Sequence, residues 1–255
     1  MDFTDKRILV TGGSRGIGRA AVEAFVAGGA RVAVNGRTAE STAAGIAAMA
    51  SGVSRDGLLA APGDISTVAG CDAAVSAAVD ALGGLDVLVN SAGVGNSGTI
   101  EDVDEAMWDE SLDVNLKGTF FCIQAALPTL RASGGNIVNV ASDAGLMGDP
   151  SLIVYCASKG GVVNMTKAMA LAFAPDVRVN CVCPGYVDTD MVRRDGIEKS
   201  ADPAAAEQAL LDYTPLRRLA QPVEIGAAIA YLAHADTRFV TGAALQIDGG
   251  TTAGR

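Results

Sequence analysis

The stretch RILVTGGSRGIGRAA, residues 7–21, is a short apolar run followed by a glycine-rich loop and a segment of helical periodicity. Glycines in such a loop let the backbone approach a pyrophosphate closely, and the N-terminus of the following helix presents free N–H groups and a partial positive charge. A strand, a glycine-rich loop and a helix in this order indicate a dinucleotide-binding βα unit. A tight turn that binds nothing is the alternative that this stretch alone leaves open.

Six further apolar runs follow this stretch, with helix-period segments between them. They are RVAV, GLLAA, LDVLVN, GNIVNVAS, VRVNCVC and ALQID. Apolar strands that alternate with amphipathic helices predict a parallel sheet covered on both faces. We therefore expect an α/β protein with a single-domain Rossmann fold over residues 1–255, in which a doubly wound sheet of seven parallel strands carries helices on both faces. Residues 188–215 break this rhythm and are rich in charge and proline, which favours a substrate-binding lid.

The charge and hydropathy of the chain exclude several classes of partner. Its formal net charge is −10 over 255 residues, whereas nucleic acids and anionic membranes bind clusters of Lys and Arg. No stretch approaches the roughly 18 to 20 apolar residues that span a bilayer, and the acidic start MDFTDK is unlike a signal peptide. We expect a cytoplasmic protein that binds neither nucleic acid nor membrane.

The cysteines and the single histidine do not form the pattern of a metal site. Five cysteines, at 71, 122, 156, 181 and 183, are scattered through apolar surroundings, which is typical of buried thiols. His234 is the only histidine, and structural zinc usually takes four Cys or His ligands. We expect no metal, and a Ser-His-Asp triad would have to use His234, which lies at the predicted end of a helix.

Three polar residues are predicted to meet at one edge of the sheet. Tyr155 and Lys159 lie four residues apart in a helix-period segment and therefore share one helix face. A nearby cation favours the phenolate form, so we expect Lys159, together with the cationic ring of a bound dinucleotide, to lower the pKa of Tyr155 in a water-poor cleft. Ser142 ends the predicted strand GNIVNVAS, which puts it at the carboxyl edge where open α/β folds bind ligands.

At this point the sequence resembles the short-chain dehydrogenase/reductase family along essentially its whole length. The matching pieces come in family order: TGGSRGIG, GDIS, NSAG, DVNLKG, the strand end at Ser142, YCASK, PGYVDT and the closing DGG. The resemblance implies a hydride transfer between a nicotinamide cofactor and a ketone or secondary alcohol.

The resemblance also implies four catalytic residues. Tyr155 would be the general acid in reduction and the base in oxidation, and Ser142 would hydrogen-bond the substrate oxygen. Lys159 would hold the ribose hydroxyls and tune Tyr155. Asn115 would anchor a water molecule in a proton relay to Lys159.

A cofactor site along the carboxyl edge follows from the same resemblance. Its residues would be Gly12, Ser14, Arg15, Gly16, Ile17 and Gly18 in the glycine loop, Arg37 after the second strand, Asp64 and Ile65 facing the adenine, Asn90, Ala92 and Gly93 under the ribose, Tyr155 and Lys159, Pro184 and Gly185, and Val187 and Thr189 holding the carboxamide.

The residues after the second predicted strand indicate which nicotinamide cofactor is used. In dinucleotide folds an acid there accepts the ribose 2′-hydroxyl, but this chain has Gly36 followed by Arg37. In the family, Arg15 lies close to the same pocket. Guanidinium groups bind phosphate bidentately, so we predict NADP(H) and, because cells keep that pool reduced, ketone reduction. In the alternative, Arg37 faces solvent and Glu40 accepts the ribose.

The predicted substrate pocket is mostly apolar. Its residues are Ser142, Asp143, Met147, Leu152, Tyr155, Tyr186 and Met191, with Leu146 nearby. Asp143 is the charged exception, and the rest favour a medium-sized hydrophobic or aromatic ketone.

Several alternatives stay open beside a reductase of free ketones. The sequences of the motifs are most similar to those of 3-oxoacyl-[acyl-carrier-protein] reductases. Arg131 could dock an acidic carrier protein. However, Ala172 and Phe173 occupy positions where carrier-dependent members often have a basic residue. A non-catalytic NADP(H)-sensing regulator and an epimerase or dehydratase are less favoured, because the Ser-Tyr-Lys set is present and the chain has no larger C-terminal domain. The family usually forms tetramers, so we expect a homotetramer.

Overall fold

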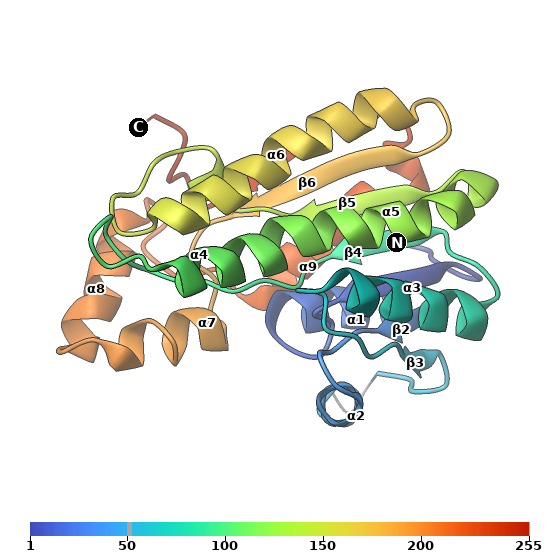
Figure 1. The fold of residues 1–255 in the computed structure, drawn as a ribbon, viewed down its shortest axis with the longest axis horizontal. Coiled ribbons are helices and arrows are strands. Elements are labelled where there is room, and N and C mark those ends of the chain that lie inside the picture. Colours follow the sequence, from blue (N-terminus) through green and yellow to red (C-terminus); the bar gives the residue numbers. More distant parts are fainter. Residues whose placement is uncertain (50–52, 255) are drawn as a thin grey trace.

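The computed structural model describes residues 1–49 and 53–254, in which a seven-stranded parallel sheet lies between two layers of helices (Figure 1). The strands are β1 (Arg7–Thr11), β2 (Arg31–Val34), β3 (Leu58–Ala60), β4 (Val87–Asn90), β5 (Asn136–Val140), β6 (Arg178–Pro184) and β7 (Ala244–Ile247). Their order is β3-β2-β1-β4-β5-β6-β7, and every neighbouring pair is parallel. The predicted fold class and all seven predicted strands are confirmed.

Helices form the connections between the strands. They are α1 (Gly16–Ala27), α2 (Ala39–Ala47), α3 (Val68–Leu82), α4 (Glu105–Leu112), α5 (Gly118–Ser133), α6 (Ile153–Phe173), α7 (Asp190–Arg193), α8 (Pro203–Tyr213) and α9 (Pro222–Ala233). A π-helical turn, η1 (Asp113–Lys117), joins α4 directly to α5, and short 3₁₀ turns lie at Asp143–Gly145 (η2), Ile197–Lys199 (η3) and Ala235–Thr237 (η4).

Side-chain alternation along the strands builds one hydrophobic core on each face of the sheet. On β1, Ile8 and Val10 pack with α1 and α9, whereas Leu9 points the other way and packs with α3 and α5. Both faces are therefore buried, which is why these strands read as continuous apolar runs rather than as alternating ones.

The sheet has its switch point between β1 and β4. From β1 the chain winds outward to β2 and β3, then crosses back to β4 and winds outward the other way. The loops that follow β1 and β4 therefore diverge, and such divergence leaves a crevice at the carboxyl ends of the strands. Thr11 at the end of β1 spans the two strands, because its hydroxyl accepts the N–H of Ser91 at 3.1 Å and of Ala92 at 3.3 Å.

The predicted lid, residues 188–215, contains α7, η3 and α8. These elements lie at the end of the molecule where α4 and α6 begin (Figure 1). Val187 and Ala220 form an isolated parallel bridge, so the two ends of the segment are joined at its base.

The cysteines are free thiols inside the protein, and His234 has a local role. Cys71, Cys122, Cys181 and Cys183 are buried and Cys156 is half-buried, as predicted from their apolar surroundings. His234 is the C-cap of α9, which confirms its predicted place at a helix end. Within residues 1–49 and 53–254 no cluster of three or more metal-ligating side chains occurs, and no helix is long and apolar enough to cross a membrane.

Gly226 lets α9 pack directly on α1, and this contact predicts a stability effect. A Cβ at position 226 would lie 2.8 Å from the carbonyl carbon and oxygen of Ala20, which are backbone atoms that cannot move aside cheaply. We expect Gly226→Ala to lower the free energy of unfolding by about 1–3 kcal/mol, because overpacking outweighs the better helix propensity of alanine.

Urea denaturation followed by circular dichroism measures this change. Gly160→Ala in α6 is the matched control, because a Cβ there would lie 3.8 Å from the Gly145 carbonyl oxygen, an ordinary van der Waals contact. Equal unfolding midpoints for the two variants would contradict the packing argument.

Candidate functional site

The glycine loop between β1 and α1 offers backbone donors at the crevice. Helix α1 begins at Gly16, and no side chain caps its N-terminus. The first N–H groups of a helix have no partner within it, so this turn is available to an anion. Gly12 has a φ of +62°, and a Cβ there would lie 2.7 Å from the Cα of Ala92. The loop can therefore lie flat against the start of the next loop only with glycine at position 12.

Asn35 holds the glycine loop through a side-chain hydrogen bond, a role that was not predicted from the sequence. It is 2% exposed at the end of β2, and its amide group donates to the carbonyls of Ala61 at 2.9 Å and Gly63 at 3.1 Å. Its side-chain oxygen accepts the N–H of Gly12 at 3.3 Å. The signal available in the sequence was a single polar residue, Asn35, directly after the apolar strand β2.

The residues expected under the adenine and the ribose follow β3 and β4. One carboxylate oxygen of Asp64 accepts from the backbone and the hydroxyl of Ser66, at 3.1 and 2.8 Å. Ile65 is only 7% exposed and packs in the core with α3 and α5. Asn90 donates to Asn139 at 2.9 Å, while its own side-chain oxygen is buried with no donor among the described residues. Together with the uncapped α1, this unpartnered acceptor fits a bound dinucleotide.

Lys159 lies on α6 beneath the same crevice. It is 4% exposed, and its ammonium donates to the carbonyl of Val140 at 2.9 Å. The Nζ atom is 5.7 Å from the centre of the Tyr155 ring, and a Cβ at Gly93 would lie 3.4 Å from it. Burial lowers the pKa of Lys159 to about 8. The lysine therefore lies between the tyrosine and the loop after β4.

In the protein alone, burial dominates the pKa of Tyr155. Burial raises it to about 12, and the hydrogen bond with Ser142 only partly opposes this. Desolvation disfavours the phenolate, and it also lowers the pKa of Lys159. The expected lowering by Lys159 and the cationic ring of a bound cofactor concerns the loaded enzyme and stays a prediction.

Ser142 and Asp143 form a compact hydrogen-bonded unit at the end of β5. The Ser142 hydroxyl donates to Oδ1 of Asp143 at 2.9 Å. The N–H of Ala144 lies 2.8 Å from the same carboxylate oxygen and 3.2 Å from the serine oxygen. Burial raises the pKa of Asp143, and the charges of Asp248 and Asp149 add to this, against the hydrogen bonds from Ser142 and Ala144. Asp143 is therefore held against the serine, with its negative form disfavoured.

Asn115 enters the site from the π-helical turn η1. Its side-chain oxygen accepts the N–H of Val94 at 2.9 Å, and its amide group donates to the Val94 carbonyl at 3.0 Å and to Ser158 at 3.1 Å. The side chain thus fixes the loop after β4 to helix α6. Its backbone carbonyl accepts the hydroxyl of Thr119 at 2.8 Å.

The segment after β6 crosses over the glycine loop. Pro184 ends the strand, Gly185 donates to the carbonyl of Ile247 at 3.2 Å, and Val187 is 3% exposed. A Cβ at Gly16 would lie 3.4 Å from the methyl group of Thr189. The structure therefore brings the residues expected to hold the carboxamide up to the N-terminus of α1.

The predicted substrate residues come from three separate segments. Met147 follows η2, and its sulfur accepts the hydroxyl of Tyr213 at 3.7 Å. The Tyr213 ring stacks edge-on against Tyr186, with centroids 6.1 Å apart. Met191 lies against the loop after β4, since a Cβ at Gly95 would be 2.8 Å from its sulfur. Tyr213 was missed because only the fold brings α8 to this place.

Leu152 lies directly before helix α6. It forms an isolated parallel bridge with Gly98, which joins the loop before α6 to the loop after β4. The predicted substrate residues thus occupy the loops around Ser142 rather than one continuous element.

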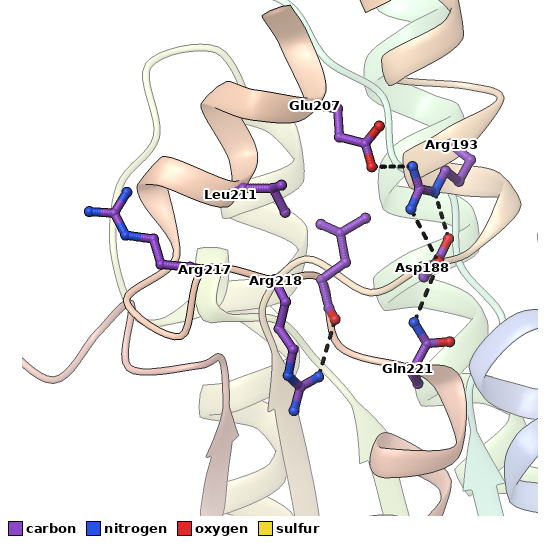
Figure 2. Close-up of a pocket in the computed structure, with 8 residues that line it drawn as sticks. Asp188, Arg193, Glu207, Leu211, Arg217, Arg218 and Gln221 are labelled. Atoms are coloured by element: carbon purple, nitrogen blue, oxygen red, sulfur yellow. Dashed lines mark hydrogen bonds and ion pairs between the residues drawn. The ribbon is translucent and has the colours of Figure 1, made fainter. Parts of the chain in front are cut away.

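Arg193 anchors the 188–215 segment, as Figure 2 shows. Its guanidinium binds both carboxylate oxygens of Asp188, at 2.7 and 3.2 Å, and also Glu207 of α8. Asp188 in turn accepts from Gln221 at the start of α9, at 3.4 Å. A cavity of about 280 Å³ opens here, and its lining also includes Leu211, Arg217, Arg218 and Leu219. These bonds fix α7 and α8 relative to the residues that precede them.

Comparison with known proteins agrees with this arrangement. The family described as short chain dehydrogenase matches residues 6–199. The chain is 38% identical to 2-(S)-hydroxypropyl-CoM dehydrogenase 3 of Xanthobacter autotrophicus, covering 96% of each chain, and 35% identical to meso-2,3-butanediol dehydrogenase of Serratia marcescens, covering 99% of this chain and 97% of that one.

A solved structure from Sinorhizobium meliloti 1021, assigned as a short-chain alcohol dehydrogenase, is 36% identical with a TM-score of 0.89, covering 99% of this chain and 98% of that one. The chain therefore belongs to the short-chain dehydrogenase/reductase family, and it is an oxidoreductase of CH–OH groups that uses a nicotinamide cofactor.

Proposed function

We propose that the protein reduces a ketone with NADPH, or oxidises the corresponding secondary alcohol, at a site formed by Ser142, Tyr155, Lys159 and Asn115. The observation that carries this proposal is the meeting of Tyr155 with Ser142 and Lys159 at the carboxyl edge of the sheet. A hydroxyl donor, a phenol and an ammonium at this edge are the groups that carbonyl reduction requires.

Each residue has a part in the proposed reaction. In reduction, the Tyr155 hydroxyl gives its proton to the substrate oxygen while Ser142 orients that oxygen. Lys159 lies close enough to Tyr155 for its positive charge to favour the phenolate that remains. Asn115 holds the loop that carries Gly93 against α6. When bound along the glycine loop and the loops after β2, β3, β4 and β6, the nicotinamide cofactor supplies the hydride.

Residues 36 and 37 support the preference for NADPH. A Cβ at Gly36 would lie 2.7 Å from the hydroxyl of Thr42, so packing against α2 leaves no room there for an acidic side chain. Arg37 is exposed, and no ion pair or hydrogen bond holds its guanidinium within the described parts of the chain. It is therefore available to a 2′-phosphate. Glu40, in the first turn of α2, is the alternative ribose acceptor.

The acids near Ser142 support a neutral substrate. Asp143 adjoins the serine. Burial raises the pKa of Tyr186, and nearby Asp149 and Asp143 raise it further. The Asp149 carboxylate repels an anionic substrate, while Met147, Tyr186 and Met191 offer apolar surface. A medium-sized hydrophobic or aromatic ketone that is not bound to a carrier fits this setting. Arg131, considered above for docking an acyl carrier, lies over the ring of Phe173 at 5.8 Å.

We also propose a homotetramer, supported by an apolar groove between the α4–α5 segment and α6. The groove has a volume of about 780 Å³, and its lining includes Leu116, Phe120, Phe121 and Met165. Trp108 is 47% exposed and Phe120 is 38% exposed, which is unusual for large apolar side chains. A second copy of the same face would cover them.

Replacing the tyrosine tests the reaction. We expect Tyr155→Phe to lower kcat for ketone reduction by about 10²–10⁴-fold, because general acid catalysis is lost. NADPH oxidation with 2,3-butanedione, ethyl acetoacetate and acetophenone as substrates measures it. Tyr231→Phe, at a half-exposed position on α9, is the control. A Tyr155→Phe enzyme of nearly normal activity would refute the mechanism, and wild-type protein that binds NADPH without turning over any ketone would favour a sensing regulator.

Cofactor choice predicts a second result. Wild-type protein is expected to have a higher kcat/KM for NADPH than for NADH, and Arg37→Ala should lower the NADPH value by about 10- to 100-fold, the effect of losing a charge-assisted hydrogen bond. The NADH value should change little. Arg238→Ala, directly after η4 and remote from the crevice, is the matched control. A wild-type preference for NADH would overturn the assignment.

The apolar groove predicts the assembly state. We expect light scattering to give a tetramer for the wild-type protein and a smaller species for Phe120→Asp, because the substitution places a charge in the covered face. Leu171→Asp, on an 84% exposed side chain outside the groove, is the control. A wild-type monomer would contradict the proposal.

A further inference from the structure

Asp143 continues a row of hydrogen-bonded side chains that begins at Tyr155. Tyr155 hydrogen-bonds Ser142, and the Ser142 hydroxyl lies 2.9 Å from Oδ1 of Asp143 and donates to it. We propose that Asp143 is a relay residue, which returns protons to Tyr155 through the Ser142 hydroxyl and exchanges them with solvent. The inference rests on the proposed function, because it takes Tyr155 as the proton donor to the substrate.

The backbone around Ser142 holds the Ser142 and Asp143 side chains of this row in place. The N–H of Ala144 donates to Oδ1 of Asp143 at 2.8 Å and lies 3.2 Å from the serine oxygen. Ser142 caps the 3₁₀ turn that contains Asp143, so the two side chains are held on one side of a rigid turn. The serine hydroxyl thus has an acceptor on one side and the tyrosine on the other.

Asp143 offers a more direct path to solvent than the groups below the crevice. Lys159 is 4% exposed and its ammonium is bonded to Val140. The carboxamide of Asn115 is already hydrogen-bonded to Val94 and Ser158. Asp143 is only half-buried, and its second carboxylate oxygen has no hydrogen-bond partner within residues 1–49 and 53–254. One intervening hydroxyl therefore separates Tyr155 from a group that reaches water.

The proton balance of the relay is simple. After Tyr155 has given its proton to the substrate oxygen, the phenolate takes the hydroxyl proton of Ser142. Ser142 takes the proton of the Asp143 carboxyl group, and the carboxylate is reprotonated by water. One O–H bond forms and one breaks at each step, and no atom changes its oxidation state. In the final arrangement Ser142 again donates to Asp143, as it does in the structure.

The surrounding charges favour this direction. The groups whose charges act on Asp143 or feel its charge are Asp149 on its own loop, Tyr155 and Cys156 on α6, Cys183 on β6, Tyr186 after it, and Asp248 after β7. Burial with the carboxylates of Asp248 and Asp149 raises the pKa of Asp143, so it carries a proton at higher pH than an ordinary aspartate. Burial also raises the pKa of Tyr155, to about 12, so transfer from carboxyl to phenolate is downhill.

Asp143→Asn tests the relay, because asparagine retains an acceptor for Ser142 and lacks the acidic proton. In steady-state reduction of 2,3-butanedione by NADPH, we expect kcat to fall by about tenfold, less than for a direct general acid because the residue acts through another. The single-turnover rate should stay unchanged, since Tyr155 starts protonated, so a burst of product appears. Wild-type kcat should fall as pH rises through the pKa of Asp143, and the variant should lose this dependence.

Chemical rescue separates a relay from a structural role. In Asp143→Ala, acetate should raise kcat in proportion to its concentration, whereas the wild-type enzyme and the control Asp236→Asn, at an exposed position remote from the crevice, should not respond. A kcat for Asp143→Asn within twofold of wild type at every pH, or a loss of activity in Asp143→Ala that acetate does not relieve, would overturn the inference. If Tyr155→Phe remains active, the proposed function fails instead, so the two failures are distinguishable.

Discussion

At the crevice the backbone of Gly12 passes so close to the loop after β4 that a Cβ would lie 2.7 Å from the Cα of Ala92. This contact brings the ends of β1 and β4 together at the switch point of the sheet. Asn35 holds the glycine loop by accepting the N–H of Gly12. Thr11 holds the loop after β4 by accepting the N–H groups of Ser91 and Ala92. The uncapped start of α1 and the loop that carries Gly93 are thereby fixed on either side of one crevice, and the positions of the remaining site residues depend on that spacing.

Helix α6 supplies the opposite wall and couples three functions in one rigid element. Tyr155, Ser158 and Lys159 lie on its first turns, where they contact Ser142, Asn115 and Val140 respectively. A small rotation of α6 would therefore disturb the phenol, the anchor of the π-helical turn and the ammonium together. Burial is the common electrostatic consequence, since it raises the pKa of Tyr155 to about 12 and lowers that of Lys159 to about 8. Both shifts favour the neutral forms in the protein alone.

Much of this arrangement could be predicted from the sequence because it follows from the period of the strands. Each strand is a continuous apolar run buried on both faces, so the position of the strand and of its carboxyl end could be predicted from the sequence. Ser142 was correctly placed at such an end. The helix spacing likewise put Tyr155 and Lys159 on one face.

Features that depend on three-dimensional contacts could not be read in the same way. Asn35 looks like an ordinary polar residue after a strand, yet it joins three segments that are separated by more than twenty residues. Tyr213 reaches Tyr186 only because Arg193 binds both Asp188 and Glu207 and so fixes α8 against the loop after β6. Spacing reports which charge is near Tyr155 but not how much water is lost, so the pKa of about 12 that burial gives this tyrosine in the protein alone could not be read from the sequence. Desolvation is a property of the whole packed site, and here it is the largest cause of the shift.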